Sequence, residues 1–183
     1  GAQVDWLIEP RYKILLERNS HVRNVVEIDT RGKLSALRRS MTEVRRRTYD
    51  ATIDFQGLLK SAVLGRLARA TERVGFAEPW LREPVAGAFY TRQVRLPDAE
   101  HVVEENLGLV KQWGADSAHR HQWRFPLPDL PEARDRMEEK LKNLGIQNSD
   151  LLIVNPGGGW AAKRWPAENF AALLTELAPA CPL

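Results

Sequence analysis

Residues 49–61 read YDATIDFQGLLKS, and this stretch decides the fold. Residues 51–55 are rich in β-branched and aromatic side chains and alternate as a short strand does. Apolar residues at helical spacing follow from Leu59 to about Arg69, after a turn at Gln56-Gly57. The stretch therefore predicts a strand that passes directly into a helix, which is the repeating unit of a parallel α/β sheet.

The same alternation extends to both sides of this stretch. Short apolar runs predict further strands at 4–8, 25–28 and 73–76, and stripes of helical period predict helices over 34–44 and 102–113. Strands that alternate with helices form parallel sheets. We predict an α/β fold with a parallel sheet and helices on both of its faces.

A second domain is predicted near the end of the sequence. Residues 114–131 carry three prolines and little periodicity, and a helical stripe follows over 133–144. The run 151–154 is apolar on both faces, as a buried parallel strand is, and a helical stripe follows over 170–177. We predict a domain over 1–145 and the beginning of another over 151–183, which is too short to bury a core alone.

Composition excludes several classes of protein. The chain has 183 residues, of which 43% are hydrophobic and 28% charged, values typical of a globular protein. No apolar run is long enough to span a membrane, and the N-terminus lacks the order of a signal peptide, so we expect a cytoplasmic protein. A single cysteine, Cys181, excludes a disulfide framework, and His119 and His121 lack partners at metal-ligand spacing. We expect no metal and no cofactor.

Positive charge is concentrated in one segment. The net charge is +3, whereas residues 23–47 hold eight basic and three acidic residues, a local charge of +5. Such a segment suggests an anionic partner, namely a phosphate, a carboxylate, a nucleic acid or a membrane surface. A solvated helix face is the alternative interpretation.

The loop 155–166, NPGGGWAAKRWP, has the chemistry of a phosphate site. It follows a predicted strand and precedes a helix that Pro166 can begin. Gly158 and Gly159 leave backbone amides uncovered, and Lys163 adds a cation near the helix N-terminus. The spacing does not fit a Walker loop, and a glycine-rich turn with a solvated lysine is the alternative.

Other polar residues allow two interpretations each. Asp54 and Gln56 end a predicted strand and could contact a ligand, although Asp54 could equally cap the following helix. Lys60 and Arg82 could bind anions or lie free on the surface, and His101 stands at a predicted helix start.

Taken together, several segments resemble glycosyltransferase family 9, the lipopolysaccharide heptosyltransferases, and within it the type I enzymes. The resemblance covers almost the whole chain. Its most specific parts are the strand–QGLLKS block and the ending KRWP. The matching stretches are 4–9, 49–61, 82–84 with 89–90, and 155–166.

The resemblance implies a GT-B architecture, in which two Rossmann-like domains face each other across a cleft. Residues 1–145 would then be the N-terminal, acceptor-side domain without its first strand, and 151–183 the beginning of the nucleotide-sugar domain. The reaction implied is an inverting, metal-independent transfer of heptose from ADP-heptose to the Kdo of the lipopolysaccharide inner core. The family's base lies in a loop that we expect before Gly1, so we assign no catalytic base and expect these residues alone to be inactive.

Site residues follow from the same resemblance. Lys163, Gly158 and Gly159 fall on the side that binds the donor phosphates, where several relatives carry hydroxyl residues in place of the two glycines. The residues grouped on the acceptor side are Arg82, Arg31, Lys33, Gln56, Lys60 and His101.

The partners implied are ADP-heptose and Kdo-lipid A at the cytoplasmic face of the inner membrane of a Gram-negative cell. The basic segment 23–47 suits an acceptor that carries carboxylates and phosphates near a membrane. One alternative is another family 9 enzyme that adds a later heptose or a different sugar. A non-catalytic nucleic-acid-binding module is the other, but the segment has no interleaved aromatic residues, so we expect no nucleic acid partner.

Overall fold

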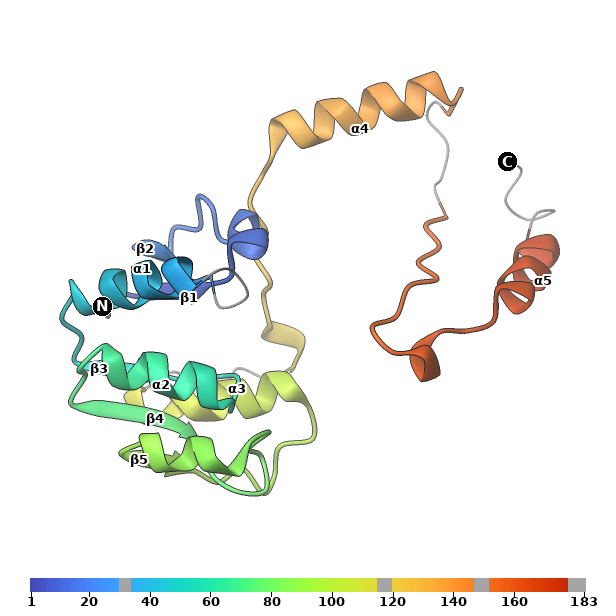
Figure 1. The fold of residues 1–183 in the computed structure, drawn as a ribbon. Helices are drawn as coiled ribbons and strands as arrows, with labels where there is room; N and C mark the ends of the chain where they lie inside the picture. The colour runs from blue at the N-terminus through green and yellow to red at the C-terminus, as the bar shows by residue number, and fades with distance from the viewer. Residues whose placement is uncertain (30–33, 115–119, 147–151, 178–183) are drawn as a thin grey trace. The chain divides into compact units, whose positions relative to one another are not determined.

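The computed structural model describes residues 1–29, 34–114, 120–146 and 152–177. The chain divides into two units, Gly1–Asp129 and Leu130–Leu183 (Figure 1). The sequence analysis placed the division between 145 and 151. In the structure, by contrast, the helix over residues 131–143 belongs to the second unit. Each unit is described separately below.

In the described residues of the first unit, five short strands form the sheets, and all of them are paired in parallel. They make a two-stranded sheet, β1-β2, and a three-stranded sheet in the order β3-β4-β5, so the predicted parallel pairing is confirmed but divided between two sheets. The fifth strand was not predicted because Arg92-Gln93-Val94 has no apolar alternation, and pairing with β4 alone defines it. The strands are β1 (Asp5–Ile8), β2 (Asn24–Glu27), β3 (Ala51–Ile53), β4 (Glu72–Phe76) and β5 (Arg92–Val94).

Helices connect the strands, as the apolar stripes predicted. In the first unit these are α1 (Leu34–Arg45), α2 (Leu59–Leu67) and α3 (Val102–Val110), with 3-10 turns η1 (Pro10–Leu15), η2 (Pro84–Phe89), η3 (Lys111–Trp113) and η4 (Arg120–Gln122). None of the helices in the described residues is long and apolar enough to cross a membrane.

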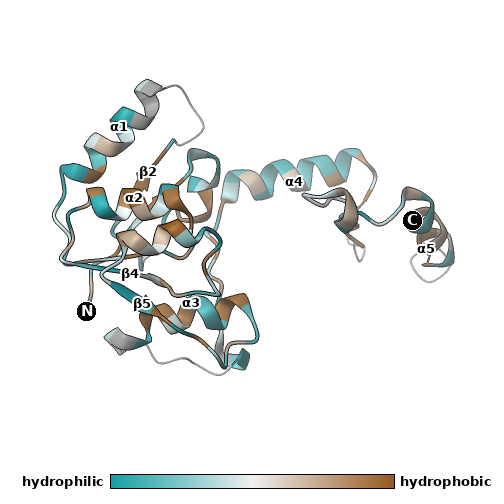
Figure 2. Cartoon of the chain, turned by 60° about the horizontal axis from the view of Figure 1, so that its bottom comes forward, coloured by the Kyte–Doolittle hydropathy of each residue, from teal (hydrophilic) through white to brown (hydrophobic). Residues whose placement is uncertain are grey.

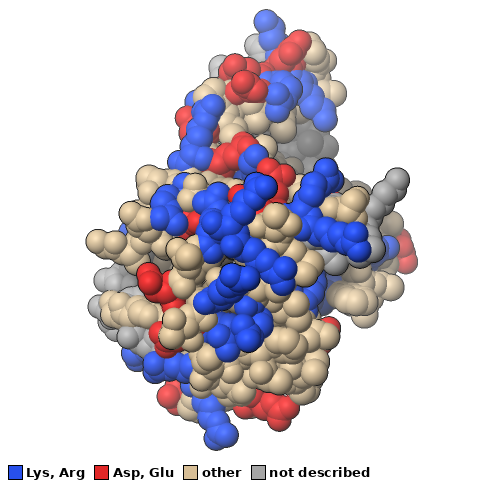
Figure 3. Space-filling model, turned by 60° about the vertical axis from the view of Figure 1, so that its left-hand side comes forward, with Lys and Arg blue, Asp and Glu red and all other residues tan. Residues whose placement is uncertain are grey.

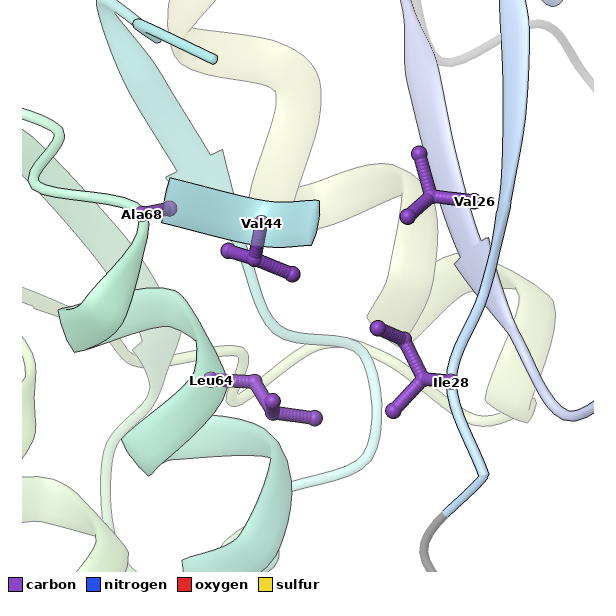
Figure 4. Close-up of a cluster of buried hydrophobic side chains, with 5 residues drawn as sticks. All are labelled: Val26, Ile28, Val44, Leu64 and Ala68. Carbon is purple, nitrogen blue, oxygen red and sulfur yellow. The ribbon is translucent and has the colours of Figure 1, made fainter. Parts of the chain in front are cut away.

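Two buried clusters form the core of the first unit. In one, Val26 of β2 and Ile28, the residue after β2, pack with side chains of α1 and α2 and with the residue after α2 (Figure 4). The other joins β4 to α3, because Val74 and Phe76 lie on one side of the strand and pack with Leu109. The full membership of the first cluster is Val26, Ile28, Val44, Leu64 and Ala68.

The two sheets are also joined outside these clusters. Trp6 of β1 stacks on Phe55, which follows β3, with ring centroids 5.9 Å apart. β1 and β3 are not paired with each other in the described residues, so each has one open edge. The additional strand that the resemblance places before Gly1 stays a prediction.

A carboxylate at the start of β1 links the strands to the chain after α1. The side chain of Asp5 is fully buried and accepts hydrogen bonds from Arg23 Nε at 2.9 Å and Asn24 Nδ2 at 2.8 Å. Arg47 and the Tyr49 hydroxyl approach its second oxygen at 3.3 and 3.2 Å. Burial raises the pKa of Asp5, but these hydrogen bonds and the Arg23 charge outweigh it and lower the pKa to about 2.

The second unit has helices but no strand in its described residues. α4 (Pro131–Asn143) and α5 (Ala167–Leu177) form where predicted, with the short turn η5 (Ala161–Lys163) before α5. The predicted strand at 151–154 is wrong for residues 152–154, which are irregular and exposed, Ile153 to 85%. A parallel strand needs neighbours that satisfy its backbone groups and cover its side chains. No described residue of 152–177 is buried, as expected of a segment too short to form a core. The hydrophobic residues of α5, brown in Figure 2, are thus only partly covered.

We predict that Asp5→Asn changes how stability depends on pH. The folded pKa lies below the ordinary value of 3.8, so the ionised carboxylate stabilises the fold above about pH 4 and ceases to do so as the pH falls toward 2. The variant should be less stable than the wild type at pH 7, and the difference should shrink in acid. Urea unfolding at both pH values measures this, with Asp50→Asn as the exposed control.

Candidate functional site

The polar residues that follow β3 and β4 meet at the carboxyl ends of these strands, where open α/β sheets bind ligands. Two loops lie here, 54–58 between β3 and α2, and 77–83 between β4 and η2. Gly57 has a φ of +65°, and a Cβ built on it would lie 3.3 Å from the backbone nitrogen of Arg82. Glycine therefore lets the two loops approach each other closely.

Asp54 organises the first loop. Its Oδ1 accepts hydrogen bonds from the backbone amides of Gln56 at 2.8 Å and Gly57 at 3.3 Å. Its Oδ2 accepts from the hydroxyls of Ser61 at 2.7 Å and Tyr90 at 2.6 Å. With both oxygens occupied and 9% of the residue exposed, Asp54 holds the turn and the start of α2, which favours the capping interpretation over ligand contact.

Tyr90, the residue after η2, anchors the same carboxylate. Its ring covers Gly75 of β4, where a Cβ would lie 2.3 Å from a ring carbon. Burial, and then the hydrogen bond donated to Asp54, raise the pKa of Tyr90 far above its usual value. The phenol therefore stays protonated and acts as a donor.

Glu83 joins the second loop to α2. Its Oε2 accepts a hydrogen bond from the backbone amide of Leu59, the first residue of the helix, at 2.7 Å. Its own amide donates to the carbonyl of Gly57 at 3.0 Å. A carboxylate at this position satisfies an unpaired amide and interacts favourably with the helix dipole. The sequence did not indicate this cap, because the residues lie 24 positions apart.

Three of the predicted acceptor-side residues lie on this framework. Gln56 and Arg82 are exposed on the two loops, and the Arg82 guanidinium has no hydrogen bond or ion pair in the described residues. Lys60, in the first turn of α2, reaches Glu9 after β1 at 3.4 Å. The structure thus brings these three residues together at the carboxyl ends of β3 and β4. Among them, the side chain of Arg82 is uncommitted, in the sense that it has no partner in the described residues.

The other acceptor-side residues have different positions. His101 caps α3, its Nδ1 accepting from the Val103 amide at 3.1 Å, and its ring lies against Trp123 with centroids 5.6 Å apart. Glu104 completes the capping box by accepting from the His101 amide at 3.1 Å. Arg31 and Lys33 lie outside the described residues.

The donor-side loop lies in the second unit. Arg164 Nε donates to the carbonyl of Gly158 at 2.9 Å, which closes the loop on itself. A Cβ on Gly158 would lie 2.9 Å from the Lys163 carbonyl oxygen, so a hydroxyl residue would not fit here without a shift. Nothing lies within 4 Å of a Cβ on Gly159.

Lys163 ends the turn η5 beside these glycines. Its ammonium is exposed and has no partner in the described residues, and the amides of Gly158 and Gly159 likewise have none there. Trp165 packs edge-on against Phe170, with centroids 4.9 Å apart, and so attaches the loop to α5. The loop therefore offers a cation and free backbone donors of the kind that bind phosphate.

These features define a Rossmann-like α/β protein with an exposed glycine-rich loop that carries a lysine, and comparison gives its family. Residues 37–180 match glycosyltransferase family 9 (heptosyltransferase), to which the chain belongs. It is 27% identical to lipopolysaccharide heptosyltransferase 1 of Pseudomonas aeruginosa, over 97% of this chain and 50% of the relative. The chain thus spans about half the length of this curated relative.

Solved structures share the fold. The family 9 glycosyl transferase of Veillonella parvula superposes with a TM-score of 0.76 at 20% identity, covering 98% of this chain and 51% of that one. The E. coli heptosyltransferase WaaC with ADP-2-deoxy-2-fluoro heptose gives a TM-score of 0.68 at 24% identity, covering 98% and 57%. The predicted Rossmann-like fold is confirmed.

We predict that Glu83→Ala loosens the acceptor-side framework. Losing the cap of α2 should lower the free energy of unfolding by about 1 kcal/mol. It should also speed hydrogen exchange at the Leu59 amide. Glu138→Ala, an exposed glutamate in α4, is the control. Unchanged exchange at Leu59 would contradict the role assigned to Glu83.

Proposed function

We propose that the protein to which this chain belongs is an inverting glycosyltransferase that moves heptose from ADP-heptose to Kdo of the lipopolysaccharide inner core. Family membership supports the transferase class. Relatives named lipopolysaccharide heptosyltransferase 1, and a neighbour solved with an ADP-heptose analogue, support the substrates. The observation that carries the proposal is the loop in which Lys163 lies beside Gly158 and Gly159, its ammonium and their amides having no partner in the described residues.

The proposed donor half works by charge neutralisation. As the acceptor oxygen forms a bond to the anomeric carbon, the bond to the ADP oxygen breaks and negative charge grows on the diphosphate. Lys163 and the glycine amides would stabilise that charge on the leaving group. The proton of the acceptor hydroxyl passes to a base that we do not assign within this chain.

The acceptor half would use the framework of Gln56, Lys60 and Arg82. A guanidinium binds a carboxylate in a forked geometry, and Kdo carries a carboxylate. Of the two cations, Lys60 is paired with Glu9, whereas the Arg82 guanidinium has no partner within the part of the chain that the structure describes. The acceptor is attached to a lipid, so we also place the enzyme at the cytoplasmic face of the inner membrane.

We predict that Lys163→Ala in the whole enzyme slows heptose transfer without unfolding the protein. A charge-assisted hydrogen bond contributes about 1.5–3 kcal/mol, which corresponds to roughly 10- to 100-fold in rate. Steady-state kinetics with varied ADP-heptose measure the loss, and Lys142→Ala in α4 is the control. Unchanged donor kinetics would remove Lys163 from the mechanism.

Arg82→Ala should affect the other substrate. We expect the KM for Kdo-lipid A to rise about tenfold, the value for one lost interaction of 1.4 kcal/mol, with the KM for ADP-heptose unchanged. Arg66→Ala, an exposed arginine of α2, serves as the matched control. Assaying Kdo-lipid A and heptosylated core side by side also tests whether the enzyme adds the first heptose or a later one.

A further inference from the structure

The solvent face of α1 is an arginine surface. Ser40 and Val44 are buried on one side of this helix. Arg38, Arg39 and Arg45 are exposed on the opposite side and have no ion-pair partner in the described residues. Lysine and arginine side chains gather on the face of the molecule that comes forward in Figure 3. Uncommitted arginines at this density attract anions.

An exposed apolar turn lies beside this surface. In η1, which follows β1, Tyr12, Ile14 and Leu15 are 44%, 47% and 46% exposed. No residue of η1 is buried. The turn and the arginine face are contiguous, since Pro10 of η1 lines the same groove, of about 630 Å³, as Arg38 and Arg39.

The acidic groups of this groove are mostly neutralised within the protein. Glu27 is paired with Lys13 at 2.8 Å, and Glu43 is paired with Arg46 and Arg47 at 3.4 Å. Asp29 is the third acidic residue that lines it. The charges left to act outward are therefore predominantly those of the arginines.

We propose that η1 and the solvent face of α1 form a docking surface for an anionic lipid bilayer. Exposed apolar side chains next to basic ones are the pattern of segments that lie in the membrane interface. The arginines would contact headgroup phosphates, and the side chains of η1 would enter the boundary of the acyl chains. The choice of a lipid surface rests on the proposed function, whose acceptor is lipid-linked.

The same surface is poorly suited to nucleic acid. Single strands bind through aromatic side chains on which bases stack. Tyr12 is the aromatic residue of η1, and the Arg11 guanidinium already lies over its ring, 4.4 Å from the centroid. Ile14 and Leu15 offer bases no stacking surface, whereas they suit a lipid interface.

Vesicle co-sedimentation of the whole protein tests the charged part of the surface. We expect binding to phosphatidylcholine vesicles that contain phosphatidylglycerol, falling with salt, and little binding to phosphatidylcholine alone. Each arginine lost should weaken binding about 5-fold, so Arg38→Glu with Arg39→Glu should weaken it at least about 25-fold. Lys140→Glu with Lys142→Glu in α4 changes the net charge equally and should leave binding unchanged.

A second pair of variants tests the apolar part. Ile14→Ser with Leu15→Ser should reduce the binding that remains at high salt, where charges are screened. Met137→Ser with Leu144→Ser, which alters exposed apolar residues of the second unit, is the control. Equal binding to neutral and anionic vesicles, unchanged binding of the α1 variant, or preferential retention of RNA or duplex DNA would each overturn the proposal.

Activity on a soluble, deacylated acceptor separates this proposal from the proposed function. The α1 and η1 variants should transfer heptose to that acceptor at the wild-type rate, which supports a role in docking alone. A wild-type protein that binds anionic vesicles but transfers no heptose would refute the proposed function and leave the docking surface standing. A wild-type protein that transfers heptose normally but does not bind anionic vesicles would refute the docking surface and leave the proposed function standing.

Discussion

The buried carboxylate of Asp54 is the constraint on which the acceptor-side framework depends. It accepts hydrogen bonds from two backbone amides of its own loop, from the Ser61 hydroxyl of α2 and from the hydroxyl of Tyr90, which follows η2. The carboxylate therefore fixes where α2 begins relative to β3. The second loop is then added through Glu83, which caps the same helix. Arg82, the residue before Glu83, is exposed and has no side-chain hydrogen bond or ion pair in the described residues.

Asp5 has the corresponding role in the other sheet. The donors to the Asp5 side chain are Asn24 of β2, Arg23 just before β2, and Arg47 and Tyr49 after α1. Asp5 therefore joins segments that β-pairing alone does not hold. Each of the two small parallel sheets thus relies on one buried carboxylate with several donors. Such a group is favourable only when its hydrogen bonds are satisfied, which explains why neither aspartate is available for chemistry.

Charge in the first unit separates into engaged and uncommitted groups. Basic residues near Asp5, Glu27 and Glu43 form internal ion pairs, while Arg82 and three arginines of α1 face solvent without partners in the described residues. The sum of charges over 23–47 indicated an anionic partner but did not separate these two groups. The proposed assignments, one arginine to the acceptor and three to a lipid surface, come from that separation.

The sequence by itself determined the alternation of strands and helices, the parallel pairing and the loop of Gly158, Gly159 and Lys163, because these depend on local periodicity and local residue chemistry. It did not determine β5, whose three residues carry no pattern, and it wrongly predicted a strand over 152–154, which has no paired strand in the described residues. Only the tertiary structure decided that Asp54 is a structural group, that Glu83 caps α2 and that Arg82 has no partner among the residues that the structure describes. Those outcomes depend on contacts between residues distant in sequence, and spacing along the chain does not record such contacts.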